Sequence, residues 1–304
     1  MTLTIRNFRP ADRQEGGSIG GPANVLLLVI LTAVLLWGAG CGNEIIPIPV
    51  PCPSCDSTPE TTCRYISLDD GTRIRTQYWP GDPNLPLVVG VHGFGGLYTD
   101  VQIVFPQGQF PALGFSMPGS LCSDRLPQGT PHTVDKAAET LAKVLEEYQD
   151  LIDQFGQNNL LIAGASFGAL VVEDYFAKHP ESMISAVVIA GQDTPETTGS
   201  IDIIAGYLNV VSFLFPATDN SHLKEYLASA RVFDVSQQIV LTQNRWLIIG
   251  CADDDLTPGV IAMADRLGDR AQYAQIPGNH LMLLANGGNI RQEVLNHLDF
   301  LLHR

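Results

Sequence analysis

Basic side chains are scarce in this chain. Its 304 residues include 17 Lys and Arg against 32 Asp and Glu, which gives a formal net charge of −15 at pH 7. Because binding to a phosphate backbone needs Lys and Arg, this balance argues against nucleic acid as a partner. The negative charge is typical of a solvated acidic surface. No internal repeat is visible, and 45% of the residues are apolar, so we expect a globular protein with a substantial core.

The apolar run nearest the amino end is too short to span a bilayer comfortably. It covers residues 25–37 and follows three arginines, a pattern that suits the core of a signal peptide. Small residues then lead directly into Cys41. This junction resembles the lipobox of bacterial lipoproteins, in which the Cys is lipidated and becomes the new amino terminus, although Gly38 stands where that pattern usually has Leu.

We therefore predict that residues 1–40 are a lipoprotein-type signal peptide. The mature protein would lie in the cell envelope, anchored to a membrane by a lipid on Cys41 and facing the periplasm or the exterior. An ordinary cleaved signal and an uncleaved anchor helix extended through Gly40 are alternatives, and all three export the rest of the chain. Residues 41–62 are Pro-rich and predict an extended tether. The folded domain is expected over residues 63–304.

Cysteine is also uncommon, and five remain besides the predicted lipidation site. Cys52-Pro-Ser-Cys55 has the spacing of a redox or zinc site, but no second pair accompanies it, so we expect no metal there. In an oxidising compartment, one or two disulfides among Cys52, Cys55, Cys63 and Cys122 are more consistent with this pattern. Cys251 follows an apolar run and is expected to be a packed free thiol.

Apolar runs alternate with helical patterns along the rest of the chain. A hairpin is expected over 65–78, a helix over 133–155 and a last helix over 289–302, with buried strands at 85–91, about 113–117, 184–190, 245–250 and 271–276. Residues 97–113 fit either a strand at 101–105 or an irregular first helix, and we favour the helix. Such alternation predicts an α/β fold with a mainly parallel sheet covered by helices on both faces.

One strand-to-helix junction carries a chemical motif. Residues 159–172 begin as an apolar run and continue as a helix, with Gly164-Ala-Ser166-Phe-Gly168 between the two parts. A Ser on such a tight turn needs neighbours without bulk, because the two backbones converge at the glycines. This is the G-x-S-x-G pattern of a nucleophile elbow in the context that the motif requires.

Four landmarks in chain order resemble those of the α/β hydrolases. His92-Gly-Phe-Gly follows a strand like the family's oxyanion loop, and the elbow comes later. Residues 118–124 are similar to the P-G-x-G-x-S-D segment, although Ser116 stands where an Asp is common and the middle Gly is missing. Residues 253–258 and 278–280 resemble the acid and His loops. The resemblance runs from about residue 65 to the end and implies an α/β-hydrolase fold.

The chemistry of that family explains these residue types. A Ser hydroxyl is a weak nucleophile, so a neutral imidazole must take its proton as it attacks a carbonyl carbon. We assign Ser166 as the nucleophile and His280 as the base, because His280 follows a strand end in a Gly-Asn turn. His92, His179 and His297 lack that context. A carboxylate then fixes the tautomer of the imidazole, and the mechanism calls for no cofactor and no metal.

Two aspartates compete for the role of that carboxylate. Asp253 lies three residues after Gly250, and Asp254 lies four before Pro258; both are usual spacings, and they disagree because this loop has one extra residue. We choose Asp254, since the Thr-Pro pair opens the next helix and fixes the register there, and keep Asp253 as the alternative. Asp193, after the preceding strand, is an outside candidate.

The resemblance also implies the oxyanion donors and a lid. The backbone amides of Phe94 and Phe167 would meet the charge on the tetrahedral intermediate, and residues 191–244 fall where many relatives carry a helical lid. An apolar patch at 208–215 fits either an acyl group or packing of the lid. We therefore expect a serine hydrolase acting on small-molecule or lipid-like carboxylic esters. A peptidase or acyltransferase on the same fold and a non-catalytic envelope lipoprotein are the alternatives.

Overall fold

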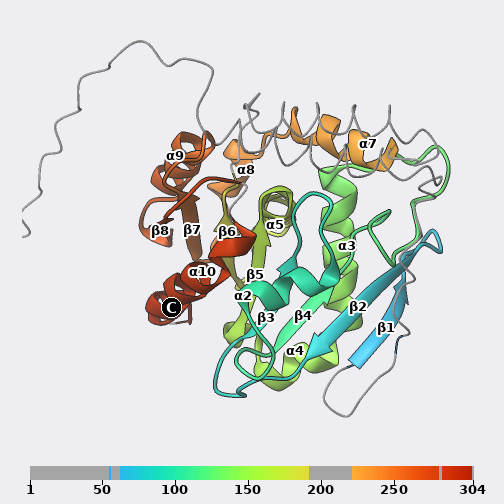
Figure 1. The fold of residues 1–304 in the computed structure, drawn as a ribbon, viewed down its shortest axis with the longest axis horizontal. Coiled ribbons are helices and arrows are strands. Elements are labelled where there is room, and N and C mark those ends of the chain that lie inside the picture. The colour runs from blue at the N-terminus through green and yellow to red at the C-terminus, as the bar shows by residue number, and fades with distance from the viewer. Residues whose placement is uncertain (1–54, 56–61, 192–220, 281–282, 303–304) are drawn as a thin grey trace, which may run out of the picture. The chain divides into compact units, whose positions relative to one another are not determined.

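The computed structural model describes residues 55, 62–191, 221–280 and 283–302 (Figure 1). The predicted signal peptide, Cys41, most of the tether, Asp193 and the apolar patch at 208–215 therefore lie outside the described residues. Within the described ranges, no helix is long and apolar enough to cross a membrane.

In the described part of the chain, eight strands form one sheet. They are β1 (Thr62–Ser67), β2 (Arg73–Trp79), β3 (Leu87–Val91), β4 (Ala112–Phe115), β5 (Leu160–Ala165), β6 (Ser185–Ile189), β7 (Trp246–Cys251) and β8 (Ala271–Ile276). Their spatial order is β1-β2-β4-β3-β5-β6-β7-β8 (Figure 1). β2 pairs antiparallel with both β1 and β4, and all the other neighbours are parallel. The predicted hairpin and the mainly parallel sheet are confirmed.

The helices lie on both faces of this sheet (Figure 1). Residues of β6 show why its sequence is apolar throughout: Ala186 and Val188 pack in one core cluster, and Val187 and Ile189 pack in the other. The described helical segments are η1 (Tyr98–Asp100), α2 (Val101–Val104), α3 (Val134–Glu147), α4 (Gln149–Phe155), η2 (Gln157–Asn159), α5 (Phe167–Lys178), α7 (Ser221–Ala230), α8 (Ser236–Ile239), α9 (Thr257–Leu267), η3 (Gly268–Arg270), η5 (Leu284–Asn286), α10 (Gly287–Asn296) and α11 (Leu298–Leu302). The cluster with Ala186 and Val188 also takes residues of α3, α5 and α9, and the other cluster takes residues of α2, α10 and α11.

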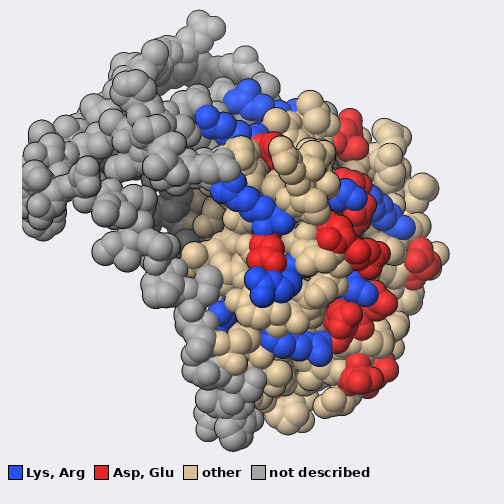
Figure 2. All heavy atoms as spheres, turned by 90° about the vertical axis from the view of Figure 1, so that its right-hand side faces the viewer, with Lys and Arg blue, Asp and Glu red and all other residues tan. Residues whose placement is uncertain are grey.

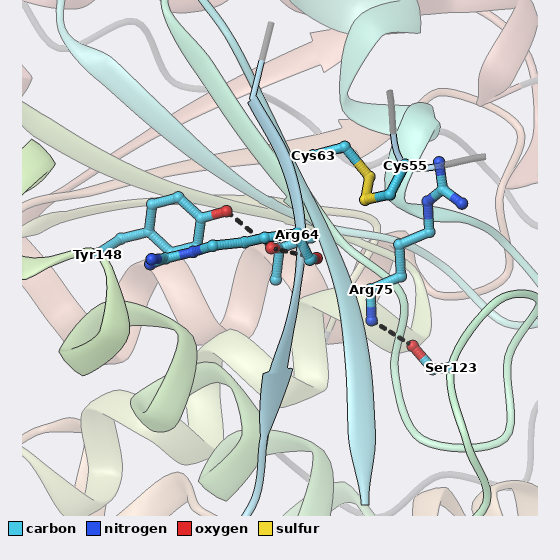
Figure 3. The surroundings of a disulfide bond; sticks show 7 residues. Cys55, Cys63, Arg64, Arg75, Ser123 and Tyr148 are labelled. Carbon is cyan, nitrogen blue, oxygen red and sulfur yellow. Dashed lines mark hydrogen bonds between the residues drawn. A yellow bond between two sulfur atoms is a disulfide. The ribbon is translucent and has the colours of Figure 1, made fainter. Parts of the chain in front are cut away.

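The single helix predicted over 133–155 is broken in the structure. It begins as expected, with the Thr133 hydroxyl accepting the N–H of Lys136 at 3.1 Å. At Tyr148 the backbone leaves helical geometry, and α3 ends before α4 begins. The Tyr148 hydroxyl shares a 2.7 Å hydrogen bond with Thr76, and the guanidinium of Arg64 lies 3.9 Å from the ring centroid (Figure 3). At the break between the two helices, the Tyr148 side chain thus contacts both β1 and β2.

The last helix also differs from its prediction. Its first residue is Gly287 rather than Asn289, and the helix is interrupted at His297, whose ring Nδ1 donates to the carbonyl of Glu293 at 2.7 Å. The same carbonyl also accepts the backbone N–H of His297 at 3.2 Å, so the ring adds a second hydrogen bond to it. The strand predicted at 113–117 lies slightly earlier, at Ala112–Phe115. The irregular first helix is confirmed by η1 and α2.

The cysteines follow the predicted division. Cys55 and Cys63 form a disulfide that joins the segment before the domain to β1 (Figure 3). Cys122 is also disulfide-bonded. Cys251 is a free and fully buried thiol at the end of β7.

Charged side chains of both signs share the outer surface. Lys136 and Lys143 of α3 pair with the glutamates three residues further on. Figure 2 shows one face of the molecule, on which Lys and Arg lie among Asp and Glu. Such exposed pairs contribute little to stability, so we attribute this surface to solvation, as its composition predicts.

Candidate active site

Ser166 occupies a strained turn between β5 and α5. Its backbone has φ 54° and ψ −121°, a conformation that costs a non-glycine residue roughly 1–3 kcal/mol. A Cβ on Gly164 would lie 2.2 Å from the carbonyl oxygen of Gly168, and a Cβ on Gly168 would lie 2.3 Å from that of Val91. Both contacts are with backbone, which cannot move aside cheaply. The two glycines therefore permit the turn that lifts Ser166 out of the sheet.

Ser166, His280 and Asp254 form one hydrogen-bonded series. Ser166 Oγ lies 2.6 Å from His280 Nε2, and His280 Nδ1 lies 2.8 Å from Asp254 Oδ2. An ionised carboxylate only accepts hydrogen bonds, so Nδ1 carries the proton. The lone pair on Nε2 then faces the Ser166 hydroxyl. The loops after β5, β7 and β8 supply the three residues, because parallel neighbouring strands end at the same edge of a sheet.

The two candidate acids occupy different environments. The Asp254 side chain is 1% exposed, and its second oxygen accepts the N–H of Leu256 at 3.0 Å. Asp253 is exposed, and its backbone N–H donates to the carbonyl of Gly278 at 2.9 Å. That bond ties the acid loop to the His loop. The structure thus brings Asp254, rather than Asp253, to the imidazole of His280.

The loop after β3 lies directly beside the elbow. A Cβ on Gly93 would lie 3.2 Å from the Ala165 carbonyl oxygen and 3.6 Å from Ser166 Cβ. The rings of Phe94 and Phe167 meet edge to face at 6.3 Å between centroids. Phe167 is the first residue of α5, where a backbone N–H has no partner within the helix. Among the described residues, the N–H of Phe94 likewise donates to no other group. Two backbone donors are therefore available next to Ser166.

His92 holds this loop in place. Its Nδ1 donates to the carbonyl of Gly93 at 2.8 Å, and its Nε2 accepts the N–H of Met117 at 3.0 Å. Burial lowers the pKa of the ring, and a neutral ring is what these two bonds require. Both ring nitrogens are occupied, so His92 holds the loop and is not the base, which agrees with its lack of the sequence context found at His280.

Ser116 also contributes to this region. Its hydroxyl, at the position where the family often has an Asp, accepts the N–H of Tyr98 at 3.2 Å in the protein interior. A neutral hydroxyl satisfies this donor without burying a charge.

One part of the site could not be predicted from the motifs. Helix α7, in the segment predicted as a lid, places Tyr226 against Phe167 with 5.0 Å between ring centroids. The signal for this contact is weak in the sequence: it consists of polar and aromatic residues at helical spacing, from His222 to Ser229. Among the described residues, no group of three or more His, Cys, Asp and Glu could hold a metal ion.

Comparison with known proteins identifies the fold. The sequence model of the family described as "alpha/beta hydrolase fold" matches residues 86–230. A search of the curated proteins found no match.

Solved structures give the same result over most of the chain. A hydrolase from Pseudomonas aeruginosa PA01 is 18% identical with a TM-score of 0.61, covering 78% of this chain and 98% of that one. An α/β hydrolase enzyme from a Medee basin deep-sea metagenome library is 18% identical with a TM-score of 0.61, covering 77% and 97%. A structure from a study of carboxylesterases of Nitrososphaera gargenis is 14% identical with a TM-score of 0.61, covering 78% and 98%. The protein therefore has the α/β-hydrolase fold.

Proposed function

We propose that the protein is a serine hydrolase that cleaves carboxylic esters through an acyl-enzyme on Ser166. The observation that carries this proposal is the series from Ser166 Oγ to His280 Nε2 at 2.6 Å and from His280 Nδ1 to Asp254 Oδ2 at 2.8 Å. A nucleophile, its base and the group that orients the base are thus within hydrogen-bonding reach of one another. The carboxylesterase named among the structural neighbours is consistent with this chemistry.

The geometry supports the following sequence of steps. His280 Nε2 takes the proton of the Ser166 hydroxyl while Oγ bonds to the ester carbonyl carbon. The tetrahedral intermediate collapses, the bond to the alcohol oxygen breaks, and the imidazolium gives that oxygen the proton. A water molecule then attacks the acyl-enzyme by the same route and releases the carboxylic acid and free Ser166. Asp254 stabilises the imidazolium at each stage.

Backbone amides would meet the charge on the intermediate. We assign this role to the N–H groups of Phe94 and Phe167, which flank Ser166 and donate to no other group within the part of the chain that the structure describes. Removing one such donor typically lowers the rate by about 10²–10³-fold. Because His92 clamps the carbonyl of Gly93, the donor at Phe94 is fixed before substrate arrives.

A fluorophosphonate probe tests the proposal directly. We expect the native protein to be labelled and Ser166→Ala to take no label. The matched control is Ser182→Ala, which changes a serine in the turn after α5, away from the elbow. If the native protein resists the probe, or if Ser166→Ala is labelled as well as the native protein, the catalytic reading is wrong. A series of p-nitrophenyl esters beside peptide substrates then separates an esterase from a peptidase, and added alcohol acceptors reveal an acyltransferase.

We further propose that the chain is exported and anchored through a lipid on Cys41, with residues 1–40 removed and residues 41–62 as a tether. The apolar run before Cys41 and the disulfide between Cys55 and Cys63 support this proposal, because disulfides persist in oxidising compartments. Mass spectrometry of the protein isolated from membranes is expected to find a diacylglyceryl Cys41 at the amino terminus. An intact Met1 end would refute processing.

A further inference from the structure

One face of α7 carries four side chains that contact the rest of the domain. His222, Glu225, Tyr226 and Ser229 are spaced three, four and seven residues from the first, so they share one side of the helix. Polar and aromatic groups thus hold this helix against the domain. A surface helix more commonly packs through an apolar stripe.

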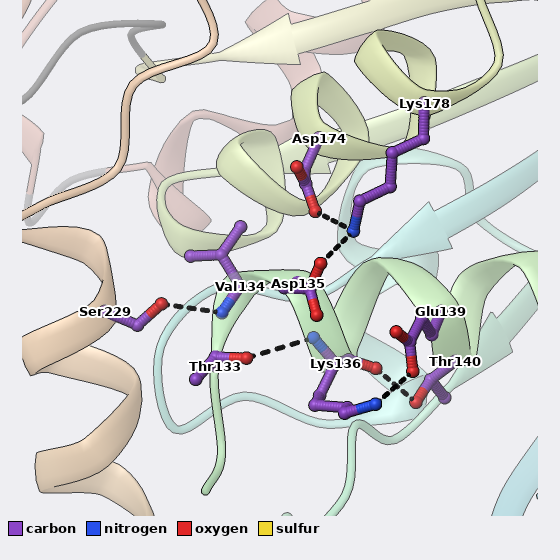
Figure 4. A network of polar contacts seen from close by, with 9 residues as sticks. All are labelled: Thr133, Val134, Asp135, Lys136, Glu139, Thr140, Asp174, Lys178 and Ser229. Atoms are coloured by element: carbon purple, nitrogen blue, oxygen red, sulfur yellow. Dashed lines mark hydrogen bonds and ion pairs between the residues drawn. The ribbon is translucent and has the colours of Figure 1, made fainter.

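Side chains of this face form hydrogen bonds with the start of α3 and with the residues just before it. Ser229 Oγ accepts the N–H of Val134 at 2.9 Å (Figure 4), and Val134 is the first residue of α3, where the backbone offers no partner. Glu225 Oε2 accepts both the backbone N–H of His132 at 2.9 Å and its ring Nδ1 at 2.8 Å. The ring of His222 lies 5.7 Å from that of His132. Helix α7 is thereby fixed in both position and rotation.

Tyr226 lies at the centre of the same face. Its hydroxyl donates to the carbonyl of Pro118 at 3.0 Å, and the residue is 3% exposed. Burial raises the pKa of this hydroxyl, so it keeps the proton that it donates. The hydrogen bond fixes where the ring lies, and the ring edge then rests against Phe167 at 64° between the planes.

Phe167 contacts both Tyr226 and Phe94, which lies in the loop after β3. Its ring touches Tyr226 with 5.0 Å between centroids and Phe94 with 6.3 Å, both edge to face. The backbone amides of Phe94 and Phe167 are the two donors of the proposed function. Three aromatic rings in contact therefore link α7 to both donors.

We propose that Tyr226 is a positioning residue for the oxyanion donors, acting through Phe167 on Phe94; this inference rests on the proposed function. The side chain reaches no reacting atom. It holds the first residue of α5 against the loop after β3, so that both N–H groups point to the position where negative charge develops. A misplacement of about 1 Å at such a site can cost 10²-fold in rate.

Three variants separate positioning from stability. Tyr226→Leu removes the ring edge, Tyr226→Phe removes only the hydroxyl, and Tyr175→Leu is the matched control. Tyr175 lies on the same helix as Phe167 and is comparably buried, but its ring packs on Phe176 and His179. All four proteins are compared as full chains, at a temperature where circular dichroism shows each to be folded.

We expect the variants to change kcat much more than KM. For p-nitrophenyl ester hydrolysis, Tyr226→Leu should lower kcat by about 10- to 100-fold and change KM by less than about threefold, because oxyanion donors act mainly in the transition state. Tyr226→Phe should fall between native and Tyr226→Leu. Tyr175→Leu should lose a similar amount of thermal stability and keep kcat within about twofold. If Tyr226→Leu keeps native kcat, or loses no more than Tyr175→Leu, the proposal is overturned.

A second readout does not depend on turnover. In protein labelled with ¹⁵N-phenylalanine, Tyr226→Leu should shift the amide signals of both Phe94 and Phe167, and Tyr175→Leu should shift neither. Unchanged signals in Tyr226→Leu would refute the positioning role. If the native protein hydrolyses no ester and takes no fluorophosphonate, the proposed function fails by itself, and the amide signals still decide whether Tyr226 positions these two groups.

Discussion

The Ser166–His280–Asp254 series and the α7 face are built by different means. Backbone contacts place the series: the N–H of Ser166 donates to the Ile189 carbonyl at 2.8 Å, and that of Asp253 donates to Gly278 at 2.9 Å. Side-chain contacts place the α7 face, through Glu225 on His132 and Tyr226 on Pro118. A site set by backbone geometry leaves a motif of glycines and short loops in the sequence. A helix face that is held by pairs of side chains leaves no comparable motif, because many different pairs of residue types could form equivalent contacts.

We expect the largest change in kcat from replacing the carboxylate of Asp254. Asp254→Asn should lower kcat by about 10³–10⁴-fold, because an amide in place of the buried carboxylate no longer selects the tautomer with Nδ1–H. Asp253→Asn, one residue away and exposed, is the matched control and should change kcat by less than about threefold. Steady-state kinetics on one p-nitrophenyl ester decides the ranking. The reverse order would move the role to Asp253.

The elbow should be intolerant of a single added carbon. Gly168→Ala should lower the free energy of unfolding by about 1–3 kcal/mol or more, since the new Cβ meets the carbonyl oxygens of Val91 and His92. Gly288→Ala, in α10 with open space around the site, should instead be neutral or stabilising by up to about 1 kcal/mol. Urea unfolding curves followed by circular dichroism measure both. Equal stabilities would mean that the backbones at the elbow are not held in close contact.

On the α7 face, the Glu225 carboxylate should make a smaller contribution to the free energy of unfolding, and this contribution should depend on pH. The pKa of Glu225 is lowered, first because its carboxylate accepts the backbone N–H of His132 and then because it accepts from the ring. A folded pKa below the unfolded value of about 4.3 means that this contribution to stability is present above that pH. It is lost as the pH falls through the folded pKa.

The measurement is the difference in Tm between native protein and Glu225→Gln. We expect a gap at pH 7 that closes as the pH falls below about 4. Glu139→Gln, whose partner Lys136 lies on the surface, should show almost no gap at either pH. A gap for Glu225→Gln that persists unchanged at low pH would contradict the assignment of this carboxylate.

The difference between the two regions also explains what the sequence could predict. Uninterrupted apolar runs located the parallel strands, since a strand covered on both faces must be apolar at every position. Glycine spacing located the elbow, and the Thr-Pro at the start of α9 pointed to Asp254. The break at Tyr148 was missed because the apolar spacing continues through it, and the hydroxyl of Tyr148 bonds to Thr76, which is 72 residues earlier in the chain. The contact between α7 and the elbow was missed because Tyr226 and Phe167 are brought together only by the fold.

The thiol of Cys251 can report how often the structure around β7 opens. Its side chain is fully buried, and burial raises the pKa of the thiol to about 11, so alkylating reagents, which react with the thiolate, find almost none in the closed molecule. The residue ends β7, three positions before Asp254. Among the cysteines of the described residues it alone is free. The rate at which a reagent modifies it therefore measures how often the strand that presents the acid detaches from its neighbours.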